Sequence, residues 1–356
     1  MIDQKTFSIG WLNEVSVKNR NADKTLIEKV CRAFAVLEGL SESGIEFVFK
    51  GGTALMLLSG STKRLSIDID IVVPEHIALL PKVEKAVLNK GFVKTEEQGR
   101  KAKSEIDKAH FKFYYEPVHK TALDLDYVLL DVLYETPKYR HLKKVKIATP
   151  FILNTADALE VNVPGFEDIL GDKMTAFAPN TTGVTYTKGG NSTAMEICKQ
   201  LYDIGMLFDK AEDMETVRRT FHEFALTEAK YRGLQISADD VLEDIYQTAL
   251  CISTRGQDGK GDFAALLEGI NRVRAYIFSE PYHIERAIPD AAKAAYLSSL
   301  VRSDKTHIEK YVQPEQIRDA IIDQPFNTKL NKLKKTNPEA FFYWFQACEL
   351  MKKFTK

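Results

Sequence analysis

The sequence lacks several features that mark common classes of protein. Its four cysteines are far apart and form no Cys-x-x-Cys pair, which argues against a zinc ribbon or a disulfide framework and suits a reducing compartment. The seven histidines show no spacing typical of metal ligands. No apolar run is long enough to span a bilayer, and the first residues lack the apolar core of a signal peptide. We therefore expect a cytoplasmic protein with no membrane contact.

Two motifs of common enzyme classes are also absent. The chain contains no Gly-x-x-x-x-Gly-Lys-Ser/Thr, which argues against a P-loop NTPase, and no Gly-x-Ser-x-Gly, which argues against a serine hydrolase. Its 49 basic and 50 acidic residues give a formal net charge of −1. Any contact with nucleic acid must therefore come from a local basic patch.

The chain changes character near its middle. It has 356 residues, of which 44% are hydrophobic and 28% charged, enough for two domains with cores of their own. Short apolar runs typical of strands alternate with helical patterns up to about residue 150, and helical periodicity dominates afterwards. These patterns predict an α+β protein with a mixed sheet and helices over residues 1–150 and a mostly α-helical part over residues 151–356.

The most informative segment begins at Gly51-Gly52-Thr53. A strand is predicted just before it, over residues 46–50, and a second over residues 67–73, after a short helix. Asp68 and Asp70 lie two apart in that second strand, and residues two apart in a strand point to the same face. Two carboxylates would therefore project together from an otherwise apolar strand.

Paired carboxylates next to paired glycines suggest chemistry on a phosphate. Carboxylates held this close repel each other, and a divalent cation is the usual compensation. The backbone of Gly51-Gly52 can approach a phosphate closely, beside a helix N-terminus that favours anions. The alternative is a half-exposed sheet on which Asp68 and Asp70 are merely solvated.

A third carboxylate would complete a two-metal site. Asp124 and Asp126 share one face of a strand predicted over residues 121–130, and either could lie beside Asp68 and Asp70 if the two strands pair. Asp124 is preferred, because Asp126 lies deeper in the apolar strand. Two metal ions held by three carboxylates would activate an attacking hydroxyl and stabilise a leaving pyrophosphate.

These residues resemble a known family. A strand, Gly-Gly-Thr, a helix and Arg-x-Ser-x-Asp-x-Asp, here Arg64 to Asp70, are similar to the AbiEii/AbiGii-type nucleotidyltransferases. These proteins are toxin components of bacterial toxin–antitoxin and abortive-infection systems, in the DNA polymerase β-like superfamily. The family's third acidic position matches Asp124.

The resemblance implies roles for these residues. Gly51, Gly52 and Thr53 would hold the triphosphate of an NTP, and Arg64 or Ser66 would contact a phosphate. Asp68 and Asp70 would bind Mg²⁺. Asp124 would complete the metal site and act as general base for the acceptor hydroxyl.

Two later motifs of the family match Lys173 and Asp203. Lys173 would offset charge on the transferring phosphoryl group, and Asp203 would position Lys173 or bind the acceptor. The chain departs from the family pattern at Lys199 and Gln200, where Arg and Asp are usual. The alternative is that neither residue is functional: Lys173 would be a solvated residue and Asp203 an exposed acid that pairs with Lys199.

The C-terminus combines lysines with an aromatic run over residues 341–345. Cations beside aromatic rings suit RNA, but aromatic residues at helical spacing more often pack into a core.

The resemblance thus predicts a Mg²⁺-dependent nucleotidyltransferase toxin with a cognate antitoxin. It would move NMP from an NTP to a hydroxyl acceptor, with the 3′ end of tRNA as the acceptor that the family suggests. Two rivals stay open. One is the same chemistry on a small molecule such as an aminoglycoside, and the other is a catalytically inactive nucleotide-binding module that acts through a partner.

Overall fold

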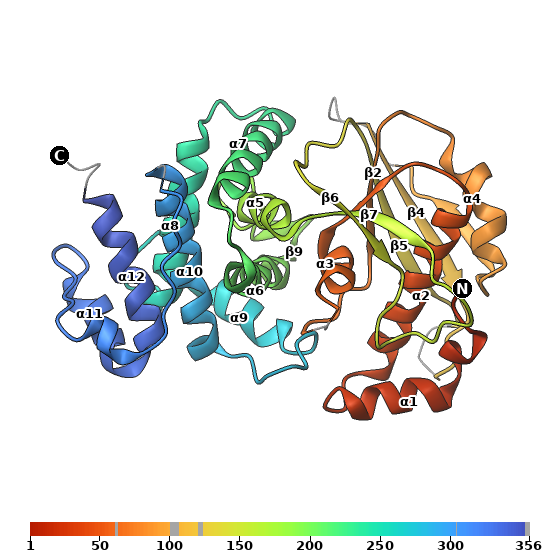
Figure 1. Ribbon diagram of the computed structural model, residues 1–356, viewed down its shortest axis with the longest axis horizontal. Coiled ribbons are helices and arrows are strands. Elements are labelled where there is room, and N and C mark those ends of the chain that lie inside the picture. The colour runs from red at the N-terminus through yellow and green to blue at the C-terminus, as the bar shows by residue number, and fades with distance from the viewer. Residues whose placement is uncertain (61–62, 100–106, 120–123, 304, 353–356) are drawn as a thin grey trace. The chain divides into compact units, whose positions relative to one another are not determined.

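The computed structural model describes residues 1–60, 63–99, 107–119, 124–303 and 305–352. The chain forms two compact units (Figure 1): Met1–Gly165 with Ala275–Pro281, and Phe166–Arg274 with Tyr282–Lys356. The first unit extends past the division expected near residue 150, because the strand Glu160–Pro164 pairs within its sheet.

The first unit is built on a mixed seven-stranded sheet of order β3-β4-β5-β2-β1-β7-β6. β2 runs parallel to β5 and β1 parallel to β7, and the other neighbours are antiparallel. The mixed sheet predicted for the N-terminal part is thus confirmed. The strands are β1 (Val48–Lys50), β2 (Ile69–Val73), β3 (Lys94–Glu97), β4 (Lys108–Tyr115), β5 (Asp126–Tyr134), β6 (Leu142–Lys146) and β7 (Glu160–Pro164).

Short polar caps and glycines delimit the helices of this unit. Asp23 caps α2, because its side chain accepts hydrogen bonds from the first backbone N–H groups of the helix. α3 starts at Gly51 directly after β1 and ends before Gly60, which takes the left-handed conformation. The helices are η1 (Gln4–Phe7), α1 (Ile9–Lys18), α2 (Lys24–Glu42), α3 (Gly51–Ser59) and α4 (Leu79–Leu88).

The central strands separate a packed face of the sheet from a more exposed one. α2 packs against α4, β2 and β5. On β5, the side chains of Asp126, Val128, Leu130 and Val132 are buried, whereas those of the alternate residues are exposed or half-buried. The alternation means that Tyr127, Leu129 and Asp131 share the less covered face.

The second unit is helical, as predicted. α10 packs against α6, α8 and α12, and α5 packs against α6 and α7. Its elements are α5 (Phe166–Ala176), β8 (Thr187–Lys188), β9 (Asn191–Ser192), α6 (Ala194–Lys210), α7 (Met214–Tyr231), α8 (Ala238–Ser253), α9 (Phe263–Val273), α10 (Ile284–Arg302), η2 (Pro314–Ile317), α11 (Asn327–Thr336) and α12 (Pro338–Met351). Within the described residues, no helix combines the length and the apolar content needed to cross a bilayer.

The aromatic run near the C-terminus lies in α12 and belongs to the core of the second unit. The rings of Phe341, Phe342, Tyr343 and Trp344 are buried, and Nε1 of Trp344 donates to Oγ of Ser253 at 2.9 Å. These rings are therefore not available to stack on RNA, and the packing interpretation of the tail is confirmed.

A segment from beyond α9 returns to the first unit. In this returning segment, Ala275–Pro281, Ile277 forms an antiparallel bridge with Arg64, and the carbonyl of Tyr276 accepts a hydrogen bond from the Leu65 N–H at 2.8 Å. The segment therefore fixes the backbone that leads into Ser66 and Asp68.

Candidate active site

Four polar residues lie side by side across the sheet. Asp70 on β2 is in register with Lys50 on β1 and with Asp131 on β5, and Asp131 is in register with His110 on β4. Side chains at one register level of neighbouring strands point to the same face. We call Lys50, Asp70, Asp131 and His110 the polar row.

The predicted Asp68/Asp70 pair lies at one end of β2 rather than inside it. β2 begins at Ile69, so the exposed Asp68 immediately precedes the strand, and the half-buried Asp70 is its second residue. Asp68 and Asp70 therefore lie at the start of β2, next to Gly51, which follows the end of β1.

Asp131 is the carboxylate that the strand pairing places beside Asp70, and the sequence prediction missed it. Its side chain is 38% exposed, and Nδ1 of His110 lies 2.5 Å from its Oδ1, at hydrogen-bonding distance. A signal was present in the sequence, because Asp131 stands between Leu130 and Val132 in an otherwise apolar run.

The expected third carboxylate, Asp124, does not lie beside Asp70. It is exposed and precedes β5, which begins at Asp126, and residues 121–123 of the predicted strand fall outside the described residues. Asp126 points to the packed face, where its Oδ1 lies 2.8 Å from Nζ of Lys29 on α2. The prediction was wrong about the register: the two strands do pair, but at Asp131.

Gly51 and Gly52 bring the two motifs into contact. Gly51 has a φ of +81°, and a Cβ there would collide with the carboxylate of Asp70. A Cβ on Gly52 would lie 2.6 Å from Oγ of Ser66 and 2.8 Å from Nη2 of Arg64. Only a residue without a side chain allows this approach. The backbone N–H groups in the first turn of α3 favour an anion at the same place.

The hydroxyl of Thr53 is engaged within the protein. It is fully buried, and its Oγ1 donates to the carbonyl of Asp68 at 2.6 Å. Its hydroxyl therefore joins α3 to the residue before β2, and its contact with a phosphate stays a prediction. Arg64 is also buried and donates from Nη1 to the carbonyl of Leu65 at 2.9 Å, whereas Ser66 is half-buried.

Lys173 and Asp203 form a buried ion pair in the helical unit. Nζ of Lys173 on α5 lies 3.1 Å from Oδ2 of Asp203 on α6 and donates to Oε1 of Gln200 at 2.8 Å. Lys199 lies 4.0 Å from Glu196. The alternative of a solvated Lys173 and an exposed Asp203 is therefore wrong. Gln200, where the chain departs from the family pattern, accepts a hydrogen bond from Lys173.

The oxygen donors of the polar row fit a hard cation that is shared with a substrate. Among the described residues, no group of three or more His, Cys, Asp or Glu side chains is placed to hold a metal ion by itself, so Asp68, Asp70 and Asp124 do not form the expected set. Asp70 and Asp131 are adjacent carboxylates, and Mg²⁺ is commonly held by one or two carboxylates together with substrate phosphates.

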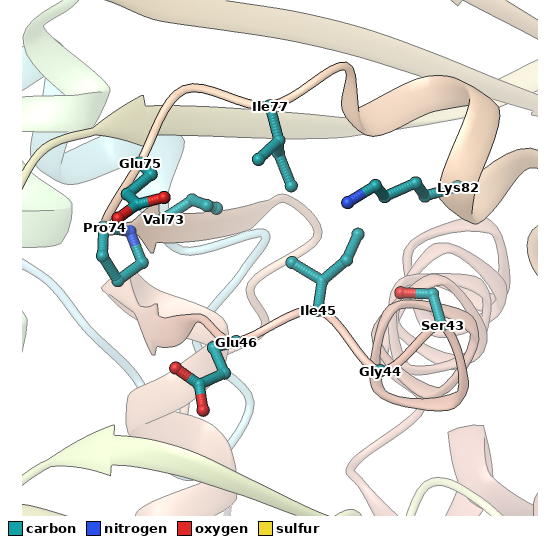
Figure 2. Close-up of a pocket in the computed structure, with 9 residues that line it drawn as sticks. All are labelled: Ser43, Gly44, Ile45, Glu46, Val73, Pro74, Glu75, Ile77 and Lys82. Atoms are coloured by element: carbon teal, nitrogen blue, oxygen red, sulfur yellow. The ribbon is translucent and has the colours of Figure 1, made fainter.

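A cavity of about 360 Å³ lies at the other ends of β1 and β2. Figure 2 shows the side chains of Ile45, Ile77 and Lys82 pointing into it, with Glu46 and Glu75 at one side. None of the predicted site residues lines this cavity. Since β1 separates it from Gly51, it is distinct from the polar row.

The sequence matches the family model described as nucleotidyl transferase AbiEii toxin, type IV TA system, over residues 35–294. The chain belongs to the AbiEii nucleotidyltransferase toxin family. Among solved structures it is similar to MenT4, a nucleotidyltransferase toxin from Mycobacterium tuberculosis H37Rv, at 12% identity and a TM-score of 0.46, covering 80% of this chain and 89% of that chain. No curated protein matches the sequence.

Membership of the AbiEii family confirms the predicted class of enzyme. The matched residues 35–294 include both glycine and aspartate motifs, the polar row and the Lys173–Asp203 pair. An AbiEii toxin is a nucleotidyltransferase of a type IV toxin–antitoxin system, which implies an NTP substrate and a cognate antitoxin.

Proposed function

We propose that this AbiEii toxin transfers a nucleoside monophosphate from an NTP to a hydroxyl at the 3′ end of tRNA, in a Mg²⁺-dependent reaction. The observation that carries the proposal is the pairing of Asp70 with Asp131, at the point where Gly51 brings the start of α3 against Asp70. Phosphate-binding backbone and metal-binding carboxylates are the two parts that such a transfer requires.

In the proposed reaction, the acceptor oxygen forms a bond with the α-phosphorus of the NTP. The bond between that phosphorus and the oxygen bridging to the β-phosphate breaks, and pyrophosphate leaves. Asp131 takes the proton of the acceptor hydroxyl, the role first expected for Asp124. His110, within 2.5 Å, orients the Asp131 carboxylate.

The remaining residues bind and neutralise the NTP. Backbone N–H groups at Gly51 and Gly52 hold the triphosphate, and Arg64 with Ser66 borders them. A Mg²⁺ ion held by Asp70 and Asp131 together with the substrate phosphates would offset the charge of those phosphates. For Lys173, which Asp203 and Gln200 hold, the role of offsetting charge on the transferring phosphoryl group stays a prediction from the family motif.

The test is transfer of label from each of four α-³²P-NTPs to total tRNA in the presence of Mg²⁺. Asp70→Asn and Asp131→Asn should each lower the transfer rate by about 10²-fold or more, the usual effect of losing a general base or metal ligand. Asp124→Asn is the matched control, because it changes the same type of residue on the same segment and should keep the wild-type rate.

The outcomes distinguish the proposed reaction from its alternatives. Loss of transfer in Asp124→Asn but not in Asp131→Asn would overturn the assignment of Asp131. Wild-type label on aminoglycosides alone would favour a small-molecule acceptor. Growth inhibition that persists in Asp70→Asn would favour an inactive nucleotide-binding module.

A further inference from the structure

A pair of tyrosines lies on the same sheet face as the polar row. Tyr127 on β5 is in register with Tyr114 on β4, which is in register with Lys94 on β3. Tyr127 and Asp131 are four residues apart on an unbroken strand, so both point to the less covered face of the sheet. Lys112, between Tyr114 and His110 on β4, shares this face as well.

The rings and the ammonium groups lie close together. The ring centroids of Tyr114 and Tyr127 are 5.7 Å apart, and Tyr127 is 37% exposed. Nζ of Lys112 lies 4.4 Å from the centroid of Tyr127, and Nζ of Lys94 lies 5.1 Å from that of Tyr114. We call Tyr114, Tyr127, Lys94 and Lys112 the tyrosine–lysine platform.

We propose that this platform binds a nucleotide of the single-stranded acceptor RNA, upstream of the 3′ nucleotide that reacts. The inference rests on the proposed function, because it assigns a place to the acceptor strand at that same site. From Asp131 to Tyr127 the strand rises about 13 Å, too far for the reacting nucleotide itself but within reach of the strand that precedes it.

The chemistry of the platform matches one base and one phosphate. Aromatic rings stack on the face of any base, and lysines attract the backbone without reading sequence. Lys112 has no carboxylate partner among the described residues, so its ammonium can turn from the Tyr127 ring to a phosphate when a base takes its place. An exposed cation–π contact is weak enough to be exchanged in this way.

Among the residues that the structure describes, Glu96 is the one acidic side chain in contact with the platform, and it is already engaged. It lies 3.1 Å from Nζ of Lys94 and accepts a hydrogen bond from the hydroxyl of Tyr114 at 3.2 Å. Lys94, Gln98 and Tyr114 together lower the pKa of its carboxyl group. Glu96 therefore orients Tyr114 and neutralises Lys94, which leaves Lys112 as the main cation for a phosphate.

The experiment measures binding and transfer with the full chain. Tyr127→Ala should raise the KM for tRNA, and the Kd for a single-stranded oligoribonucleotide, by about 5- to 100-fold, the range expected for loss of one stacked base. Tyr127→Phe, which keeps the ring, should restore both values. The KM for NTP should not change, nor should transfer to free adenosine, which is too short to reach the platform.

A charge-matched pair tests the phosphate contact. Lys112→Ala should reduce the salt dependence of oligoribonucleotide binding, with a slope smaller by about one. Lys144→Ala on β6, at the opposite edge of the sheet, should leave the slope unchanged. Both exchanges remove one lysine from a strand, so a difference between them reports position rather than net charge.

Two results would overturn the platform, and a third would overturn only the proposed function. An unchanged KM and Kd in Tyr127→Ala, or a loss in Tyr127→Phe as large as in Tyr127→Ala, would show that the ring does not stack on a base. Wild-type protein that binds the oligoribonucleotide through Tyr127 but adds no nucleotide to any RNA would keep the platform and refute the transfer reaction.

Discussion

At the scale of single residues, Gly51 is the position with the strictest requirement. Its φ of +81° disfavours a side chain, and a Cβ would also enter the space of the Asp70 carboxylate. Gly44 separates these two effects, because its φ is +72° and no atom lies within 4 Å of its Cβ position.

Gly51→Ala is therefore predicted to impair transfer activity in addition to the loss of stability that backbone strain causes. Gly44→Ala should lower the free energy of unfolding by about 1–3 kcal/mol, the usual cost of a strained backbone, and keep wild-type transfer. Gly51→Ala should show a comparable or larger loss of stability and also lose transfer, because it displaces Asp70. Urea unfolding and the tRNA labelling assay measure the two effects. Wild-type transfer in Gly51→Ala would mean that the position of Asp70 does not matter.

The same residues show what a sequence can and cannot predict. The glycine pair and Asp70 were found because their signals are local: backbone freedom, and a charge inside an apolar strand. Asp131 was missed because it lies beside Asp70 only through the register between β2 and β5. The sequence of either strand alone does not predict that register. The hydrogen bond of Thr53 could not be predicted for a similar reason, since only the fold shows that its hydroxyl donates to the carbonyl of Asp68.

At the scale of elements, most helices and strands follow from periodicity, but the contacts between them do not. Gln200 looked like a drift from the family pattern in the sequence. Because α5 packs against α6, Gln200 accepts a hydrogen bond from the Lys173 ammonium. The aromatic residues of α12 allowed two interpretations, RNA stacking and core packing, for the same reason. Their burial in the structure decides for core packing.

Lys293 is the residue that joins three elements of the helical unit. It lies on α10, and its Nζ lies 2.9 Å from Asp209 on α6 and 3.0 Å from Glu339 on α12. Burial lowers the pKa of its ammonium group, but the carboxylates of Asp290, Asp209 and Glu339 more than offset this and raise the pKa above its ordinary value.

Lys293→Met should therefore destabilise the protein by about 1–3 kcal/mol, because two carboxylates lose a charged hydrogen-bond donor. Since the folded pKa is raised, the stabilisation by Lys293 is complete at neutral pH and is lost only as pH rises through that pKa. The exposed pair Arg272–Glu268 provides the control, and Arg272→Met should cost at most about 1 kcal/mol. Equal shifts of the urea midpoint in the two variants would contradict this account.

At the scale of the whole molecule, the two units are linked by a chain that crosses between them three times, at residues 165–166, 274–275 and 281–282. The sequence pattern indicated two parts but not the return of Ala275–Pro281, because this segment lies in sequence between helices of the other unit. The chain also has two tryptophans, Trp11 in the first unit and Trp344 in the second, so each unit carries its own fluorescent probe.

Ile277 allows the returning segment to be tested with these probes. Its side chain is 6% exposed, and its backbone bridges Arg64 in the first unit. Ile277→Ala should cost about 2–5 kcal/mol, the range for truncating a buried isoleucine. The loss should lower the urea midpoint reported by Trp11 in a Trp344→Phe background more than the midpoint reported by Trp344 in a Trp11→Phe background. A larger shift at Trp344 would mean that Ile277 stabilises the helical unit, although it lies between α9 and α10 in the sequence and pairs with Arg64 in the structure.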